Sequence, residues 1–205
     1  MPQKVTPVAT SIVFESQWLR VEALDMGAAD PSHGDPAYVP APYYRVVENA
    51  GVICVLLSAD GDFVMVRQPR PVVEMFTLEF PAGRIDAGET PEQAVRREVF
   101  EETGMRLARV QCLGQTEPIP SRLHTLQSLF IGVAAAAVTP VKERGPEMVI
   151  VPRAQFLSVI QQEGMHCLVA LGAIKLAELL WSIDIFKASI NEINQQFSAN
   201  IHGAE

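Results

Sequence analysis

The sequence predicts an α/β fold, a sandwich of helices on a mixed β-sheet preceded by a small β extension. Short apolar runs separated by turn residues indicate strands, and they occur both before and after a central helix bounded by glycines. Two further segments near the C-terminus have helical length and pattern. With 205 residues, of which 48% are hydrophobic and 20% charged, the chain can bury one sizeable core.

The N-terminal part is expected to form strands outside the main domain. Residues 10–26 hold two short apolar runs typical of a hairpin-like pair, and residues 43–47 predict a third strand. Between them, residues 27–42 are rich in Gly, Pro and Ala, which predicts a loop. Three strands cannot bury both faces of their sheet, so we expect a homodimer that covers their apolar side chains. These side chains are Ile12, Phe14, Trp18 and Leu19.

The main domain is predicted to begin with a buried strand over residues 52–57. A turn at residues 59–62 and a returning strand over residues 63–67 follow it. Residues 78–80 lead into the segment of the central helix. After it, further strands are expected over residues 107–114, 126–135 and 148–151, and helices over residues 153–162 and 169–182. The expected parts of the chain are a β extension (1–47), the main domain (48–184) and a helical C-terminal tail (185–205) that frays.

The central helix shows both of its ends in the sequence. Thr90 is a suitable N-cap, Pro91 suits the first helical position, and Gln93 completes a capping box. Gly104 fits the left-handed residue that terminates a helix. The sequence therefore predicts a short helix between Thr90 and Gly104.

Three glutamates share one face of this helix. At 100° per residue, Glu98, Glu101 and Glu102 fall within one arc of about 100°. Such carboxylates repel one another unless a cation lies among them, and they suit a hard divalent metal that also binds phosphate oxygens. Arg97, four residues before Glu101, is placed to pair with a glutamate and hold its rotamer. The alternative, a solvated acidic surface, fits poorly with the apolar residues and glycines around the charges. The helix therefore indicates hydrolysis or transfer at a phosphate group.

The segment from Gly83 to Met105 resembles the signature box of the Nudix hydrolases at every defining position. The matching residues are Gly83, Glu89, Arg97, Glu98, Val99, Glu101, Glu102, Gly104 and Met105. The resemblance implies an α/β/α sandwich that binds Mg2+ or Mn2+ and hydrolyses a nucleoside diphosphate linked to another group. The metal ligands it implies are Glu98, Glu101, Glu102 and the backbone carbonyl of Ala82. The residues it implies as bracing the box are Gly83, Glu89, Arg97 and Gly104.

Motifs outside the box resemble the ADP-ribose pyrophosphatase branch of that family. These motifs are Met65–Arg70 and Thr77–Gly83, together with Pro120, sixteen residues after Gly104. The N-terminal strands also match this branch, whose members use them to dimerise and to cover the adenosine. Residues 120–124 depart from the branch pattern, as does the alanine-rich stretch 132–139, and both departures leave the exact substrate open.

Candidate catalytic and substrate-binding residues complete the predicted site. The branch places a base glutamate on a loop before a strand, for which Glu147 is the first candidate and Glu143 the second. A box glutamate such as Glu101 is the remaining alternative. Guanidinium groups suit planar anions, so Arg70 and Arg67 are candidates for the pyrophosphate or ribose oxygens. Further candidates for substrate contacts are Glu79, Arg122 and His124, and those for stacking on the base are Phe14, Trp18, Tyr43 and Tyr44.

Composition narrows the partners and the compartment. The formal net charge of −8 argues against a nucleic-acid backbone or an anionic membrane as partner. The three cysteines, Cys54, Cys112 and Cys167, lie far apart in apolar stretches, which predicts buried free thiols and a cytoplasmic location. The chain start lacks the apolar core of a signal peptide, and the most apolar stretch, residues 129–138, is too short to span a bilayer.

Three functions are compatible with these features. The first is hydrolysis of ADP-ribose or a related nucleotide sugar to a nucleoside monophosphate and a sugar phosphate. The second is Nudix hydrolysis of another substrate, such as a nucleoside triphosphate or a dinucleotide. The third is nucleotide binding without turnover, which the retention of all four box glutamates disfavours.

Overall fold

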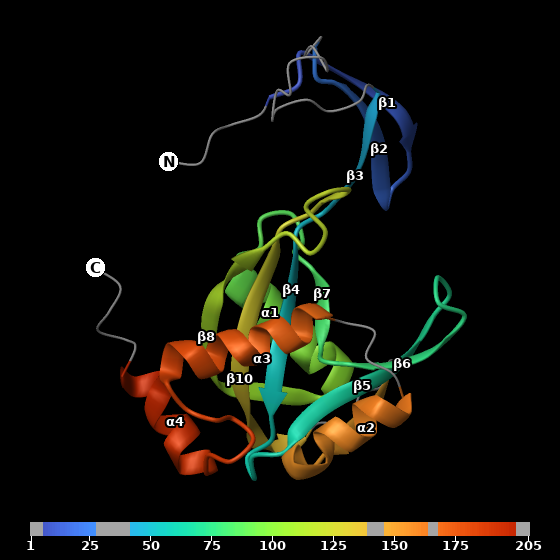
Figure 1. Ribbon diagram of the computed structural model, residues 1–205. Coiled ribbons are helices and arrows are strands. Elements are labelled where there is room, and N and C mark those ends of the chain that lie inside the picture. The colour runs from blue at the N-terminus through green and yellow to red at the C-terminus, as the bar shows by residue number, and fades with distance from the viewer. Residues whose placement is uncertain (1–5, 28–41, 139–145, 164–167, 200–205) are drawn as a thin grey trace. The chain divides into compact units, whose positions relative to one another are not determined.

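The computed structural model describes residues 6–27, 42–138, 146–163 and 168–199 (Figure 1). The chain divides into two compact units. The first combines residues 1–50 with residues 117–126, and the second combines residues 51–116 with residues 127–205. The segment 117–126 therefore joins the N-terminal strands, although the sequence analysis placed it within the main domain.

The first unit is a four-stranded sheet in the order β1-β2-β3-β9. Its strands are β1 (Ala9–Glu15), β2 (Leu19–Asp25), β3 (Tyr43–Glu48) and β9 (Leu123–His124). Strands β1, β2 and β3 are antiparallel neighbours, and β9 pairs parallel to β3. Every residue of β1 is exposed, including Ile12 and Phe14, and Trp18 in the following turn is 58% exposed. The predicted apolar surface of this extension is therefore present.

A buried carboxylate joins the strands of the first unit. Glu22 on β2 is only 4% exposed and accepts hydrogen bonds from Nε of Arg20 and Nε of Arg45, each at 2.7 Å. Burial alone would raise the pKa of Glu22, but the hydrogen bonds from Arg45 and Arg20 hold that pKa below its usual range. The Arg45 contact ties β2 to β3.

The second unit is built on a mixed sheet in the order β11-β5-β4-β10-β8, with β6 paired to β5 and β7 to β4. Its strands are β4 (Gly51–Leu57), β5 (Phe63–Arg70), β6 (Met75–Glu79), β7 (Ala82–Arg84), β8 (Met105–Thr116), β10 (Gln127–Val138) and β11 (Glu147–Val151). Its helices are α1 (Pro91–Thr103), the 3₁₀ turn η2 (Arg153–Gln155), α2 (Phe156–Glu163), α3 (Leu168–Trp181) and α4 (Ile190–Ala199). Strand β10 runs parallel to β4 and antiparallel to β8.

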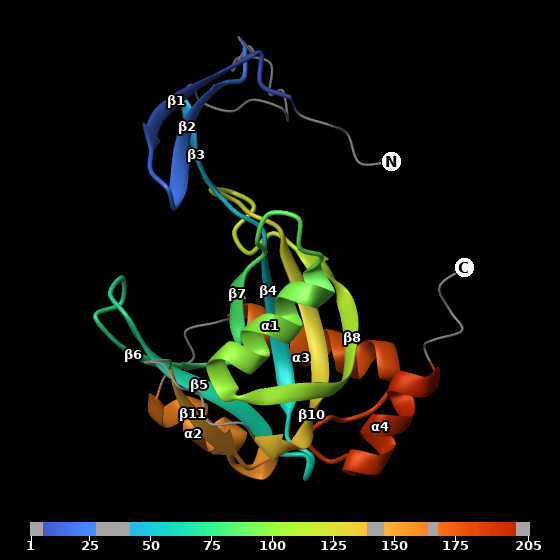
Figure 2. The same ribbon diagram turned by 180° about the vertical axis from the view of Figure 1, so that it is seen from behind.

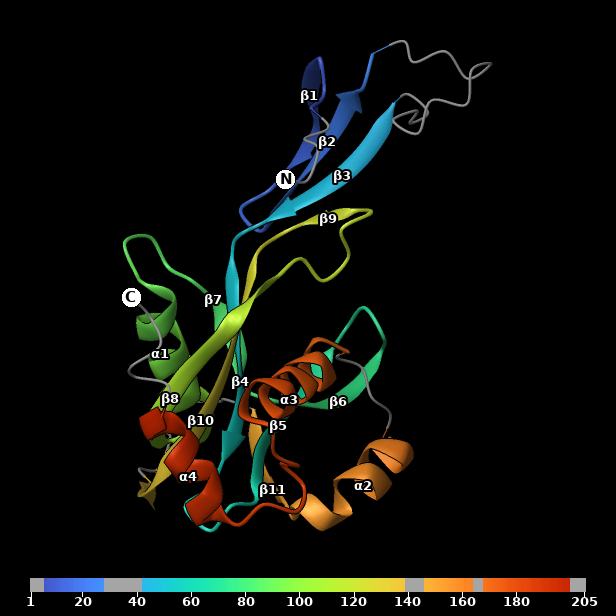
Figure 3. The ribbon, with the colours of Figure 1, turned by 60° about the vertical axis from the view of Figure 1, so that its left-hand side comes forward.

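Helices cover both faces of this sheet. Helix α3 crosses one face in Figure 1, and α1 crosses the opposite face in Figure 2. Figure 3 shows the layers from the side, with α1 on one side of β4 and with α2 and α3 on the other. The second unit is thus the predicted α/β/α sandwich with a mixed sheet, and the N-terminal strands supply the predicted β extension.

Alternation along the strands separates two cores, because successive side chains point to opposite faces. The core on the α1 side includes Val52, Cys54 and Leu56 of β4, Val64 of β5, and Val95 and Val99 of α1. The core on the α2 and α3 side includes Ile53, Val55 and Leu57 of β4, Met65 of β5, Phe156 of α2 and Ala173 of α3. The same alternation determines which candidate side chains lie on the α1 face of the sheet, where the box is.

The predicted strands and helices are present with shifted ends, and three features differ from expectation. Strand β6 and the short strands β7 and β9 were not predicted. Helix α4 is not a frayed tail over its described length, because Ile193 and Phe197 are buried and Phe197 packs 5.1 Å from the ring of Trp181. Cys54 is a buried free thiol, as expected, and burial raises its pKa, but Cys112 is an exposed free thiol. Cys167 lies outside the described residues.

A helix that spans a membrane must be both long and strongly apolar, and these requirements apply to the helices in the described part of the chain. None of them meets both requirements.

Candidate active site

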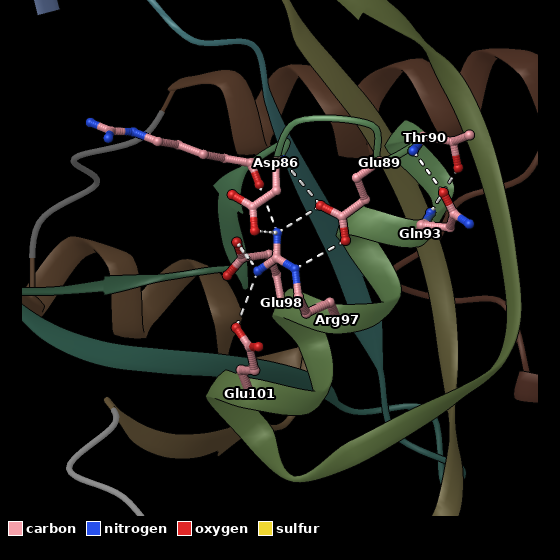
Figure 4. A network of polar contacts seen from close by, with 8 residues as sticks. Asp86, Glu89, Thr90, Gln93, Arg97, Glu98 and Glu101 are labelled. Carbon is pink, nitrogen blue, oxygen red and sulfur yellow. Dashed lines mark hydrogen bonds and ion pairs between the residues drawn. The ribbon is translucent and has the colours of Figure 1, made fainter. Parts of the chain in front are cut away.

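The ends of α1 are fixed as the sequence predicts. The Thr90 hydroxyl accepts from the Gln93 amide at 3.2 Å, and the Gln93 side chain accepts from the Thr90 amide at 2.8 Å (Figure 4). At the other end, Gly104 adopts a φ of 70° and its amide donates to the Phe100 carbonyl at 2.9 Å. These caps fix where the helix begins and ends.

The Glu98 carboxylate of α1 lies against Gly83 of β7, where a larger residue would have to displace it. A Cβ atom on Gly83 would lie 2.0 Å from Cδ of Glu98, far inside van der Waals contact. Gly83 pairs with Val52 of β4, so it stands on the α1 face of the sheet. The box glycine therefore lets the Glu98 carboxylate approach the backbone of β7.

Arg97 is the centre of the polar network around the helix (Figure 4). Its Nε and Nη2 donate to the two oxygens of Glu89 at 3.0 and 2.9 Å. Its Nη2 also donates to the Arg84 carbonyl at 2.9 Å. Its Nη1 donates to Glu98 at 2.7 Å and to Glu101 at 3.1 Å. One guanidinium thus connects the loop before the helix, β7 and two box glutamates, which is the geometry of a brace.

The charges of this network shift the titration of its members. Hydrogen bonds from Arg97 hold the pKa of Glu89 below its usual range. Hydrogen bonds to Glu89, and then to Glu98 and Glu101, raise the pKa of Arg97. The Arg97 and Glu89 side chains therefore stay charged and paired throughout the neutral range.

Two box carboxylates lie where negative charge is unfavourable. Glu102 accepts from the Ala82 amide at 3.1 Å, and burial raises the pKa of Glu102 to about 7, with the charges of Glu98 and Glu79 acting in the same direction. Burial also raises the pKa of Glu98, to which the charges of Glu101 and Glu89 add, while Arg97 opposes the rise. Burial therefore makes the charged forms of both carboxylates unfavourable.

These carboxylates fit a divalent cation by their chemistry, although they are not arranged as a finished ligand set. Within the described residues, no three His, Cys, Asp or Glu side chains converge as metal ligands. Arg97 Nη1 instead lies between Glu98 and Glu101, at 2.7 and 3.1 Å from their oxygens. Carboxylate oxygens such as those of the box glutamates are nevertheless the hard ligands that Mg2+ or Mn2+ prefers. Glu98, Glu101, Glu102 and the Ala82 backbone would hold it.

The β5–β6 hairpin brings Arg70 and Glu79 to the same side of the sheet. Glu79 pairs with Val66 of β5, two residues from Val64, which packs in the α1 core. Nε and Nη2 of Arg70 donate to the two oxygens of Glu79 at 2.9 and 2.8 Å. The Ala82 amide, three positions after Glu79, donates to Glu102, which brings the end of the hairpin to the box. The Arg70 charge lowers the pKa of Glu102 and the Glu79 charge raises it.

Arg67 and Glu147 face the other side of the sheet. They are direct partners in the β5–β11 register, and Arg67 lies one residue from the α1-facing Val66. Nη2 of Arg67 binds Glu163 at the end of α2 at 2.6 Å, and its Nε lies 3.7 Å from Glu147. The two candidates therefore lie on the α2 side, away from α1. Glu143, the second candidate base, lies outside the described residues.

The remaining candidates belong to the first unit. The Arg122 guanidinium stacks over the Tyr43 ring, 4.3 Å from its centroid, and also donates to the Tyr44 carbonyl. Nδ1 of His124 lies 3.1 Å from Glu117. A pocket of about 200 Å³ lies in this unit. It is lined by Tyr43, Arg45, Glu117, Pro120, Arg122 and His124, and Tyr44 is not part of its lining. Phe14 and Trp18 are exposed and lie outside this pocket.

Two contributors to the site were not predicted. Arg84 takes part through its backbone carbonyl, which no side-chain pattern reveals. Thr77 donates to Glu79 at 2.5 Å, a contact that depends on the hairpin register. The sequence signal for Thr77 was its place two residues before Glu79 in a strand, where both side chains share a face.

We expect replacement of Arg97 by glutamine to lower the melting temperature by several degrees, measured by circular dichroism. The substitution removes the guanidinium that binds Glu89, Glu98 and the Arg84 carbonyl together, and it leaves the carboxylates to repel one another. Lys187→Gln is the matched control, because it removes an exposed ion pair with Asp184 that contributes little to stability. Equal melting temperatures for the two variants would contradict the bracing role.

Comparison with known proteins agrees with this geometry. The family profile described as "NUDIX domain" matches residues 47–161, more than half of the chain. An ADP-ribose pyrophosphatase of Bacillus subtilis is 42% identical over 61 residues, covering 29% of this chain and 33% of the relative. An NAD-capped RNA hydrolase of Homo sapiens is 43% identical over 90 residues, covering 43% of this chain and 18% of the relative.

A solved structure shares the fold. The crystal structure of an ADP compounds hydrolase superposes with a TM-score of 0.67 at 20% sequence identity, covering 88% of this chain and 95% of that one. The matches to the two curated relatives span a third or less of the relatives' lengths. Members of the family generally use a divalent metal such as Mg2+. From the family profile, the box and the fold together, the chain belongs to the Nudix family.

Proposed function

We propose that this chain is a metal-dependent pyrophosphohydrolase whose substrate is ADP-ribose or a related nucleotide sugar. The products would be a nucleoside monophosphate and a sugar phosphate. The observation that carries the proposal is the set of three helix-face glutamates beside β7, two of which, Glu98 and Glu102, have raised pKa values because of burial. The Arg70–Glu79 pair next to them supplies a guanidinium suited to phosphate oxygens.

The chemistry follows from what a pyrophosphate bond demands. A bound Mg2+ or Mn2+ would neutralise phosphate charge and acidify the attacking water. Glu98, Glu101 and Glu102 would supply the oxygen ligands, and Arg97 with Glu89 would keep the helix and β7 in register. Arg70 would orient the phosphates. A carboxylate base would take the proton from the attacking water, and Glu143 is preferred over Glu147 because Glu147 lies on the α2 side.

A turnover screen tests the substrate class. Purified protein with Mg2+ should release phosphorylated products from ADP-ribose and from other nucleotide sugars faster than from nucleoside triphosphates. Faster hydrolysis of NADH or of NAD-capped RNA would favour the dinucleotide alternative, for which the similarity to an NAD-capped RNA hydrolase is the specific support. Against it, the formal net charge of −8 disfavours a nucleic-acid backbone as partner. Binding without turnover of any of these compounds would favour a nucleotide-binding domain.

We also propose a homodimer that buries the exposed apolar residues of β1, and a cytoplasmic location, which suits the exposed free thiol of Cys112. Light scattering at micromolar concentration should give twice the mass of one chain. The double variant Ile12→Glu, Phe14→Glu should give a monomer, because it places charges on a surface that needs an apolar partner.

Leu157→Glu is the matched control for this assembly. Leu157 on α2 is 64% exposed, comparable with Ile12 and Phe14, but it lies in the second unit. A monomeric wild type, or a dimer that persists in the double variant, would contradict the proposed interface.

A further inference from the structure

Thr77 occupies an unusual position for a threonine of a protruding hairpin. It lies on β6 of the β5–β6 hairpin, where the neighbouring Phe76 is 65% exposed, yet Thr77 itself is only 1% exposed. Its hydroxyl lies 2.5 Å from Oε1 of Glu79 and 3.4 Å from the Gln68 carbonyl. The shorter contact has the length of a hydrogen bond from a hydroxyl to a charged carboxylate.

The hairpin register explains this burial. In this register Arg70 is opposite Met75, and Glu79 is opposite Val66. The backbone positions of Arg70 and Glu79 are therefore four residues apart along the hairpin, which is about 13 Å at 3.3 Å per residue. Thr77 lies midway between them on the same face, opposite Gln68. Because Arg70 nevertheless reaches Glu79 at 2.8 Å, the pair must extend along the hairpin across Thr77. The ion pair therefore covers the threonine.

This arrangement makes the position of the Arg70 guanidinium depend on the Glu79 carboxylate. Glu79 is 11% exposed at its side chain, whereas Arg70 is 44% exposed and accessible to a substrate. Oε1 of Glu79 accepts from both Thr77 and Arg70, so the hydroxyl fixes the oxygen to which the guanidinium is bound. Threonine is suited to this role because its branched Cβ restricts its rotamers.

We propose that Thr77 is a positioning residue for substrate recognition. Its hydroxyl fixes the Glu79 carboxylate, which holds Arg70 extended along the hairpin beside Glu102, where it meets the substrate phosphates. This inference rests on the proposed function for its effect on substrate, and on the hairpin geometry alone for its effect on Arg70. A hydrogen bond to a charged group is typically worth about tenfold or more in an equilibrium constant.

Kinetics with ADP-ribose and Mg2+ test the effect on substrate. Thr77→Val removes the hydroxyl and keeps the shape, and it should raise KM about tenfold while kcat stays within about twofold, because it loosens substrate binding and leaves the box intact. Thr77→Ser, which keeps the hydroxyl, should restore most of the wild-type KM. An unchanged KM in Thr77→Val, or a KM in Thr77→Ser as high as in Thr77→Val, would overturn the proposal. So would a lower melting temperature of Thr77→Val with unchanged kinetics.

Nuclear magnetic resonance tests the positioning without turnover. The Arg70 Nε–H signal, identified by its loss in Arg70→Lys, should be sharp in the wild type, broadened in Thr77→Val and sharp again in Thr77→Ser. An identical signal in wild type and Thr77→Val would overturn the positioning role. If the wild type hydrolyses none of the screened nucleotides, the proposed function fails while the Arg70 signal still decides the role of Thr77.

Discussion

Glu102→Gln should lower kcat by several orders of magnitude and leave the fold intact. Glutamine keeps the oxygen that accepts from the Ala82 amide, but it removes the negative charge that a divalent metal needs. Because burial makes the charged form of Glu102 unfavourable without metal, the neutral glutamine should not lower the metal-free melting temperature. Loss of activity would then report on metal chemistry and not on unfolding.

Three measurements separate these effects. EDTA should abolish wild-type turnover, and Mg2+ or Mn2+ should restore it. Mg2+ should raise the melting temperature of the wild type, because a ligand that binds the folded state stabilises it, and this rise should be small or absent in Glu102→Gln. Glu92→Gln is the control on the same helix, since Glu92 is exposed and pairs only with Arg96 among the interactions described. Near-wild-type turnover by Glu102→Gln would refute the proposed site.

The features that the sequence predicted well are local ones. The helix caps at Thr90, Gln93 and Gly104 depend on backbone groups within a few residues, so the sequence contains all the information they need. The shared face of Glu98, Glu101 and Glu102 follows equally from helical periodicity. The pairing of Arg97 with Glu101 was predicted for the same reason.

The features that the sequence did not predict depend on contacts between distant segments. That Arg97 also reaches Glu89 and the Arg84 carbonyl requires the close passage of β7, which Gly83 permits. Likewise, Arg70 and Arg67 were both candidate substrate ligands, and they lie three positions apart along β5. Strand alternation then places them on opposite faces, and which face carries α1 is a tertiary fact.

Strand register also determines the position of Glu147, one of the two candidate catalytic bases. Strand register places Glu147 opposite Arg67 on the α2 side, where its carboxylate is exposed and lies 3.7 Å from that guanidinium. A base must lie within hydrogen-bond reach of the attacking water, which the box carboxylates would hold on the α1 side. From the sequence, Glu147 was the first candidate and Glu143 the second. Because the register places Glu147 away from α1, Glu143 is the base that we propose first.

We therefore expect Glu143→Gln to lower kcat about 10²–10⁴-fold, the range typical of a positioned general base, with little change in KM. The acid limb of its pH–rate profile should flatten. Glu147→Gln is the matched control from the same segment, and it should stay within a few-fold of wild type because it removes only an exposed contact with Arg67. A large loss in Glu147→Gln with a normal Glu143→Gln would contradict the argument from strand register. If neither variant loses activity, the proton passes to a box glutamate, and Glu101, the most exposed of the glutamates that bind Arg97, is the residue to replace next.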